Sequence, residues 1–204
     1  TNVKLGKWLS KSRHAGNRMY TVTLEERATC PKTCKHWYDC YGNTMPFAHR
    51  FKYDSHLTKK MDKELAYLNT KKYGVLIRLH VLGDFPDLKY VEQWEHWLDK
   101  YENISCYGYT AHSPKESIGG RIAIMNEQRW DRWSIRFSNY PKYKLSANSD
   151  KVSKNGITCP EQAGQTKSCG TCGLCWNKST KRILFMTHSR DLRKGNNANN
   201  KPTN

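Results

Sequence analysis

Seven of the eight cysteines of this chain fall into two short clusters, and each cluster opens on the same tripeptide, Thr-Cys-Pro. The first has the spacing Cys30-x3-Cys34-x5-Cys40, and the second has the spacing Cys159-x9-Cys169-x2-Cys172-x2-Cys175. Thiols grouped in this way form disulfides, bind zinc or bind an iron–sulfur cluster. The remaining cysteine, Cys106, stands inside an apolar run and is expected to belong to the core.

The spacing of the second cluster argues against disulfides. Cys169, Cys172 and Cys175 lie too close together to bridge one another without strain, and each would need a distant partner. The first eight residues hold two lysines and no apolar stretch, which is unlike a secretory signal. No apolar run is long enough to span a membrane. We therefore expect free thiols, a reducing cytoplasm and no membrane partner.

Three thiols within seven residues favour an iron–sulfur cluster at Cys169, Cys172 and Cys175. A cubane presents several irons close together, so closely spaced thiolates can each bind a different iron. Cys159 is followed by Pro160, as is the distal cysteine of ferredoxin-type [4Fe–4S] sites, and we assign Cys159 as the fourth ligand. Zinc is the alternative metal, although a third close cysteine is superfluous for one tetrahedral ion.

The first cluster offers the thiols of Cys30, Cys34 and Cys40 and no obvious fourth ligand. These thiols could bind a second [4Fe–4S] cluster with one open iron, or bind zinc together with a histidine such as His36 or His49. They could instead add ligands to a single site shared with the C-terminal cluster. Packing of three unliganded thiols is the remaining interpretation. The spacing leaves open whether the chain holds one metal site or two.

Apolar periodicity predicts alternating strands and helices. The expected strands are Arg18 to Leu24, Tyr73 to Val81, Ile104 to Thr110, Trp133 to Ser138 and Arg182 to Thr187. Helices are expected over 56–69, over 88–101 with Asp87 as the cap, and from Ser113-Pro114 onward. This order predicts an α/β fold with a mostly parallel sheet, crossover helices, a partial (β/α) barrel-like shape and cysteine-rich metal-binding loops. We expect one domain over residues 1–193 and a disordered tail over 194–204.

In parallel α/β folds the reactive surface lies beyond the carboxyl ends of the strands. His80, Asp84 and Arg136 are therefore candidate ligand-binding residues on one rim, together with the first cysteine loop. Each also has a structural interpretation, because Asp84 can cap its own turn, and His80 and Arg136 can be buried polar residues. Arg78, on the same strand as His80, is expected to be structural. The tryptophans near helical segments are expected in the core: Trp94, Trp97, Trp130 and Trp133.

Three stretches carry a family resemblance: the run TCPKTCKHWYDCYG, then RLHVLGDF and YGYTA, and then ITCPEQ and CGTCGLCW. In this order they resemble the uncharacterised phage proteins named for gene product eighty-eight of a mycobacterial phage. The resemblance covers most of the chain and implies a phage or prophage origin, the host cell cytoplasm and an iron–sulfur site. It implies no established reaction.

The first cysteine loop is also similar to the cluster loop of radical-SAM barrels, which follows the first strand. The last gap, however, is five residues instead of two, and Leu82-Gly83-Asp84 stands where those enzymes have Gly-Gly-Glu. Binding of S-adenosylmethionine is therefore not expected. The resemblance thus extends to the position of the loop and not to its ligand.

The net charge does not identify the binding partner of this chain. The formal net charge is +17, from 35 Lys+Arg against 18 Asp+Glu, which suits nucleic acid, yet the positive residues are spread along the chain. Three functions remain as hypotheses. In the first, the chain is a non-catalytic iron–sulfur protein that binds a host protein or perturbs host metabolism. In the second, it is an enzyme with an open-iron cluster, of the radical-SAM type or another. In the third, it is a zinc-stabilised nucleic-acid-binding protein.

Overall fold

The computed structural model of this chain describes residues 5–10, 14–149 and 153–186. Seven strands form one sheet: β1 (Arg18–Val22), β2 (Val75–Leu79), β3 (Ile104–Thr110), β4 (Trp133–Ser138), β5 (Ser146–Ser149), β6 (Ile157–Thr158) and β7 (Arg182–Phe185). Their order is β1-β2-β3-β4-β5-β7-β6, and all neighbouring pairs are parallel. The sheet is open, because the edge strands β1 and β6 do not pair with each other. The predicted α/β fold with a parallel sheet is confirmed.

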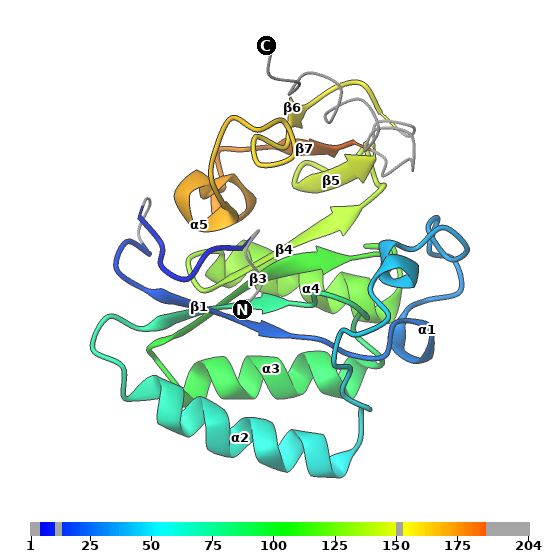
Figure 1. Cartoon of the computed structure of the whole chain (residues 1–204). Helices are drawn as coiled ribbons and strands as arrows, with labels where there is room; N and C mark the ends of the chain where they lie inside the picture. The colour runs from blue at the N-terminus through cyan, green and yellow to red at the C-terminus, as the bar shows by residue number, and fades with distance from the viewer. Residues whose placement is uncertain (1–4, 11–13, 150–152, 187–204) are drawn as a thin grey trace, which may run out of the picture.

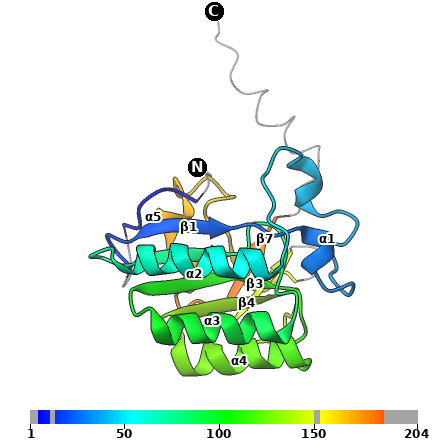
Figure 2. The same cartoon turned by 90° about the horizontal axis from the view of Figure 1, so that it is seen from below.

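The helices are α1 (Glu26–Thr29), α2 (Ser55–Asn69), α3 (Leu88–Lys100), α4 (Ser117–Arg129) and α5 (Cys169–Cys172), with short 3-10 turns η1 (Tyr41–Thr44) and η2 (Leu174–Trp176). Helices α2, α3 and α4 are the crossovers between β1 and β4, and Figure 2 shows them lying together over one face of the sheet. Helix α5 lies on the opposite side of the sheet from α2 and α3 (Figure 1). No helix in the described part of the chain is long and apolar enough to cross a membrane.

The long helices begin where their capping residues predict. The side chain of Asp54 accepts a hydrogen bond from the Leu57 amide at 2.8 Å, and that of Asp87 accepts one from the Tyr90 amide at 2.7 Å. Helix α4 begins at Ser117 and not at Ser113, because residues 113–116 form a turn closed by the Glu116 amide on the Ser113 carbonyl. The predicted helix existed, but its start was placed four residues too early.

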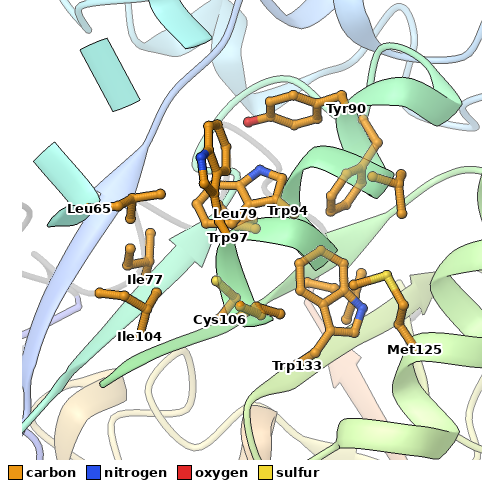
Figure 3. Close-up of a cluster of buried hydrophobic side chains, with 14 of the residues drawn as sticks. Leu65, Ile77, Leu79, Tyr90, Trp94, Trp97, Ile104, Cys106, Met125 and Trp133 are labelled. Carbon is orange, nitrogen blue, oxygen red and sulfur yellow. The ribbon is translucent and has the colours of Figure 1, made fainter. Parts of the chain in front are cut away.

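The core beneath the helices is rich in aromatic side chains (Figure 3). Trp94 and Trp97 of α3 meet edge-to-face at 5.0 Å, and Trp133 of β4 packs on Phe85 at 5.7 Å between centroids. Burying each such side chain contributes about 1.5–3 kcal/mol. Cys106 lies in the same cluster and is 1% exposed, so its expected place in the core is confirmed. The four tryptophans predicted to be core are buried as well.

Two strands were missed from the sequence, β5 and β6. The residues of β5, Ser-Ala-Asn-Ser, are short and polar, and they show neither alternation nor β-branched side chains. They are nevertheless buried, and the side chains of Asn148 and Ser146 hydrogen-bond each other at 2.9 Å. Thr187 and the predicted tail over 194–204 lie outside the described residues, so the division into one domain and a tail stays a prediction.

Candidate functional site

The face of the sheet opposite α2, α3 and α4 carries large polar side chains. Arg78 of β2 pairs in register with Tyr107 of β3, and Tyr109 of β3 pairs with Arg136 of β4. Because side chains alternate along a strand, these residues point away from the face that carries Cys106 and the helix-side core. Tyr107 packs instead against Trp176 at 4.7 Å. The inner face is therefore aromatic and basic.

The C-terminal cysteines meet above this inner face. A single pocket is lined by all four of them, Cys159, Cys169, Cys172 and Cys175, together with Pro160, Glu161, Gly173, Leu174 and Ile183. The cavity between these residues is small, with a volume of about 10 Å³. Cys159 and Cys169, ten positions apart in the chain, thus line the same pocket.

Local geometry explains how α5 presents its thiols. Ser168 and Thr171 form a reciprocal capping box at the start of the helix, and Gly173 ends it in the left-handed conformation with φ +76°. Gly170 faces the carbonyl of Trp8, where an added Cβ would lie 2.6 Å from the oxygen. The one-turn helix therefore packs directly on the N-terminal segment, with Cys169 and Cys172 at its two ends.

The thiols in this pocket are buried, and the inner face supplies donors to them. The Tyr109 hydroxyl donates a hydrogen bond to Cys175 Sγ at 2.7 Å. Burial raises the pKa of Cys175, and burial together with the neighbouring Cys175 raises the pKa of Cys169 to about 12. Without a cation these two thiols are protonated at neutral pH, so a metal would have to displace their protons.

Arg136 is fully buried beside the same pocket. Its guanidinium donates four hydrogen bonds to main-chain carbonyls, those of Cys175 (2.7 Å), Asn177 (2.9 Å), Leu174 (3.2 Å) and Lys181 (3.2 Å). Burial lowers the pKa of Arg136. No carboxylate of the described residues lies within ion-pair distance of it. Arg136 thus fastens the loop that carries Cys175 and adds an uncompensated positive charge next to it.

Arg78 is a second such cation. Its guanidinium lies 5.6 Å from the centre of the Tyr109 ring and interacts electrostatically with the Cys169 thiol. Its Nε is buried and has no hydrogen-bond partner among the described residues, and no described carboxylate pairs with it. A buried cation without a counterion costs several kcal/mol. A negatively charged group bound at this inner face would therefore be stabilised by the two arginines.

The N-terminal cysteines form a separate group at the carboxyl ends of β1 and β2. Cys30 follows α1 directly, and its thiol interacts electrostatically with Cys34, Cys40 and Asp84. Burial raises the pKa of Cys30 and of Cys34. The Gly42 amide donates a hydrogen bond to Cys40 Sγ at 3.4 Å. Figures 1 and 2 both show α1 and α5 at opposite ends of the sheet, so Cys30, which follows α1, lies apart from Cys169 and Cys172 of α5.

A salt bridge and its hydrogen bonds hold the loop around the N-terminal group. Arg50 pairs with both carboxylate oxygens of Glu26, at 2.7 and 3.0 Å. It also donates to the carbonyls of Gly42, Met45 and Ala48. The hydrogen bond from Arg50 lowers the pKa of Glu26. The loop keeps its shape through these contacts, which leaves the thiols available.

The three candidate ligand-binding residues lie in different places. Asp84 is buried beside Cys30 and Cys34, and it accepts hydrogen bonds from the amides of Ala111 at 2.7 Å and Phe85 at 2.8 Å. His80 packs on the helix side at 4.9 Å from the Phe85 ring, and burial lowers its pKa to about 3. Arg136 lies with the C-terminal cysteines. The single rim shared by these three is therefore wrong, although each residue is buried.

Tyr41 was given no role from the sequence, and Arg78 was assigned to structure alone. Tyr41 adjoins Cys40 and interacts electrostatically with Arg78. The alternation of Tyr107 and Tyr109 along one strand could have indicated that both share the face of Arg136. The neighbouring cysteines could not have been anticipated, because that proximity depends on the path of the C-terminal loop.

The thiols are not arranged for a single ion. Among the described residues, no three His, Cys, Asp or Glu side chains come together as ligands of one metal ion. In a tetrahedral zinc site, sulfur atoms at about 2.3 Å from the metal lie only about 3.8 Å from one another. A cubane cluster spreads its thiolates over different irons and accepts a wider arrangement. The cysteine-rich loops expected from the sequence are present, and among the described residues no metal site is formed by them; metal binding by these loops stays a prediction.

The family comparison covers the N-terminal part of the chain. The model of the family described as gene product 88 matches residues 1–126, which include the first cysteine group and strands β1 to β3. No curated protein and no solved structure matches the chain. The C-terminal cysteines lie beyond the matched residues.

Proposed function

This chain belongs to the gene product 88 family, and on that premise we propose that it is a phage-encoded iron–sulfur protein. The family match supports the phage origin, and we place its action in the cytoplasm of the infected host. In this proposal a [4Fe–4S] cluster is bound by Cys159, Cys169, Cys172 and Cys175. The open sheet would then be a partial barrel, with the cluster on the face opposite α2, α3 and α4.

The observation that carries the proposal is the unbalanced charge beside the cysteine pocket. Arg136 is fully buried, Arg78 is half-buried with its Nε out of contact with solvent, and no described carboxylate pairs with either. A [4Fe–4S] core with four thiolates carries a net charge of about −2. Such an anion would balance both guanidinium groups in a site where burial strengthens their attraction. A zinc ion with four thiolates has the same charge, but the spread of the thiols favours a cluster over a single ion.

The residues around the pocket have defined tasks in this proposal. Arg136 fixes the main chain on either side of Cys175, and Tyr109 donates a hydrogen bond to its sulfur. Hydrogen bonds to ligating sulfurs stabilise the thiolate and tune the potential of a cluster. A bound cluster would supply one-electron transfer. Trp176 is wholly buried in the apolar cluster against which Cys169 and Cys175 pack, and there it keeps water from their inner side.

Anaerobic purification after expression with iron tests the proposal. We expect a brown protein with a broad visible absorption band and with iron and sulfide in equal amounts. Cys172→Ala should lower the iron content, whereas Cys106→Ala, which removes a thiol outside both groups, should leave it unchanged. A colourless protein loaded with zinc, or equal iron content in the two variants, would contradict the assignment.

A further inference from the structure

We propose that the edge of the sheet at the amino end of β1 is a binding surface for single-stranded nucleic acid. The residues of this edge surface come from the N-terminal segment, from β1, and from the end of α2 with the turn that follows it. They are Trp8, Arg18, Tyr20, Tyr67, Lys71, Lys72 and Tyr73. The inference goes beyond the proposed function, because none of these residues lines the cysteine pocket.

Arg18 connects the N-terminal segment with the edge strand. Met19 packs into the inner apolar cluster and Tyr20 against the helix-side core, so Arg18 shares the helix-side face of β1 with Tyr20. The guanidinium carbon of Arg18 lies 5.7 Å from the centre of the Trp8 ring and 5.6 Å from that of Tyr20. Trp8 is 55% exposed. One arginine therefore stacks with two rings at the accessible edge of the sheet.

The end of α2 supplies two more pairs of a cation and a ring. Lys71 Nζ lies 3.9 Å from the centre of the Tyr67 ring, and Lys72 Nζ lies 5.5 Å from that of Tyr73. Tyr67 is 58% exposed and Tyr73 is 65% exposed. Neither ring is therefore needed to fill the core, and both are accessible to a partner.

Strand register brings these two groups together. Arg18 pairs in register with Val75, which begins β2 two residues after Tyr73. A Cβ added at Gly16 would lie 3.9 Å from the Tyr73 ring, so the turn before β2 packs beside the chain that enters β1. Figures 1 and 2 both show this turn at the end of the sheet opposite α1. Two stretches that are distant in sequence thus form one surface.

The edge surface is rich in positive charge. Residues 1–24 hold five lysines and arginines and no Asp or Glu, and residues 65–83 hold three and none. Arg18, Lys71 and Lys72 form no salt bridge with a carboxylate of the described residues. The exposed acids Glu64 and Glu102 flank the surface in sequence. The surface therefore attracts an anionic partner.

The combination of rings and cations fits a nucleotide chain. A base stacks on an aromatic ring, and its phosphate pairs with a cation. A single strand presents both groups at every nucleotide, whereas the bases of a duplex are already stacked on one another. An anionic membrane would also attract the cations, but insertion into lipid uses an apolar face. The large apolar side chains that the edge surface exposes are Trp and Tyr, each with a cation over its ring.

Fluorescence anisotropy of a labelled single-stranded oligonucleotide, titrated with the full chain, tests the surface. Tyr67→Ala with Tyr73→Ala should weaken binding by about 5- to 150-fold for each ring that stacks on a base. Tyr38→Ala with Phe47→Ala is the matched control, because these rings are 90% and 99% exposed on the loop after α1, at the other end of the sheet. The control should bind as tightly as the wild type. Circular dichroism shows whether each variant is folded.

The dependence of binding on salt tests the cations separately. The logarithm of the binding constant should fall linearly with the logarithm of the salt concentration. Lys71→Gln with Lys72→Gln should make this slope shallower by about 1.4, because each cation that meets a phosphate of a single strand contributes about 0.7. Lys32→Gln with Lys35→Gln, which changes two exposed lysines of the loop after α1, should leave the slope unchanged.

Four outcomes would overturn the inference. Absence of binding at low salt would exclude the surface, and equal weakening by the two aromatic double variants would show that its rings have no special part. Equal or tighter binding of a duplex of the same sequence would exclude base stacking. Binding to vesicles of anionic phospholipid without binding to the oligonucleotide would identify a membrane as the partner. These measurements do not depend on iron content, so their failure leaves the proposed iron–sulfur function standing.

Discussion

The substitution Arg136→Met gives the sharpest test of the charge argument. It removes four hydrogen bonds to main-chain carbonyls, and at about 1 kcal/mol of net stability each it should cost about 4 kcal/mol. Arg132→Met is a matched control, because Arg132 donates three hydrogen bonds, to the carbonyls of Leu98, Tyr101 and Ile104. The control should cost about 3 kcal/mol on the same scale. Arg132 reaches the strand and helix ends on the helix side, and its cysteine neighbour is Cys106, which belongs to neither cysteine group.

Urea denaturation of the metal-free proteins measures the two stability losses, and we expect them to be similar. Iron retention should then differ between the two variants, because Arg136, unlike Arg132, supplies positive charge beside the pocket. Release of iron to a chelator under anaerobic conditions should be faster in Arg136→Met than in Arg132→Met. Equal release rates at similar stability would refute the reasoning that buried cations hold an anionic cluster.

Three further predictions concern other parts of the molecule. Tyr109→Phe removes the hydrogen bond to Cys175 Sγ and should lower the reduction potential of the bound cluster, because that bond stabilises the more negative, reduced state; an EPR-monitored redox titration measures the shift. Gly83→Ala should lower the free energy of unfolding by about 2–5 kcal/mol, because φ is +84° and the new Cβ would lie 2.7 Å from Leu24 Cβ. Gly120→Ala in α4 is the control: the nearest atom to its new Cβ would be at 3.6 Å, and the substitution should raise the free energy of unfolding by about 0.5–1 kcal/mol. The Glu26–Arg50 pair lowers the pKa of Glu26 in the folded state, so its contribution to stability is present above the ordinary pKa of 4.5 and is lost as the pH falls below that value. The melting temperatures of wild type and Glu26→Gln should therefore converge in acid. A difference in melting temperature that stays constant with pH would exclude the pair as its cause.

The order of strands and helices from β1 to β4 could be predicted because each crossover unit is local. Capping by Asp54 and Asp87 and the apolar periods of α2 and α3 are written within one stretch of chain. Strand β5 could not be predicted, because its Ser-Ala-Asn-Ser sequence has no intrinsic preference for a strand. It is extended because β4 and β7 provide main-chain partners on both sides.

The candidate site, like the fold, was predicted in part from the sequence. The sequence by itself predicted the two cysteine groups, because residues three positions apart are held near one another by the chain. It placed Arg136 and Asp84 at the same rim, and only the tertiary structure separated them. Side-chain direction and loop path decide such placements, and neither is a local property.

The sequence also showed that strand arginines and clustered thiols are both present, but not that they meet. Arg78 and Arg136 face the cysteines because strand register puts them on the inner face, and because the segment after β6 folds back across that face. The same tertiary path keeps the N-terminal group at the other end of the sheet (Figure 1). Long-range packing therefore decided that seven thiols form two groups.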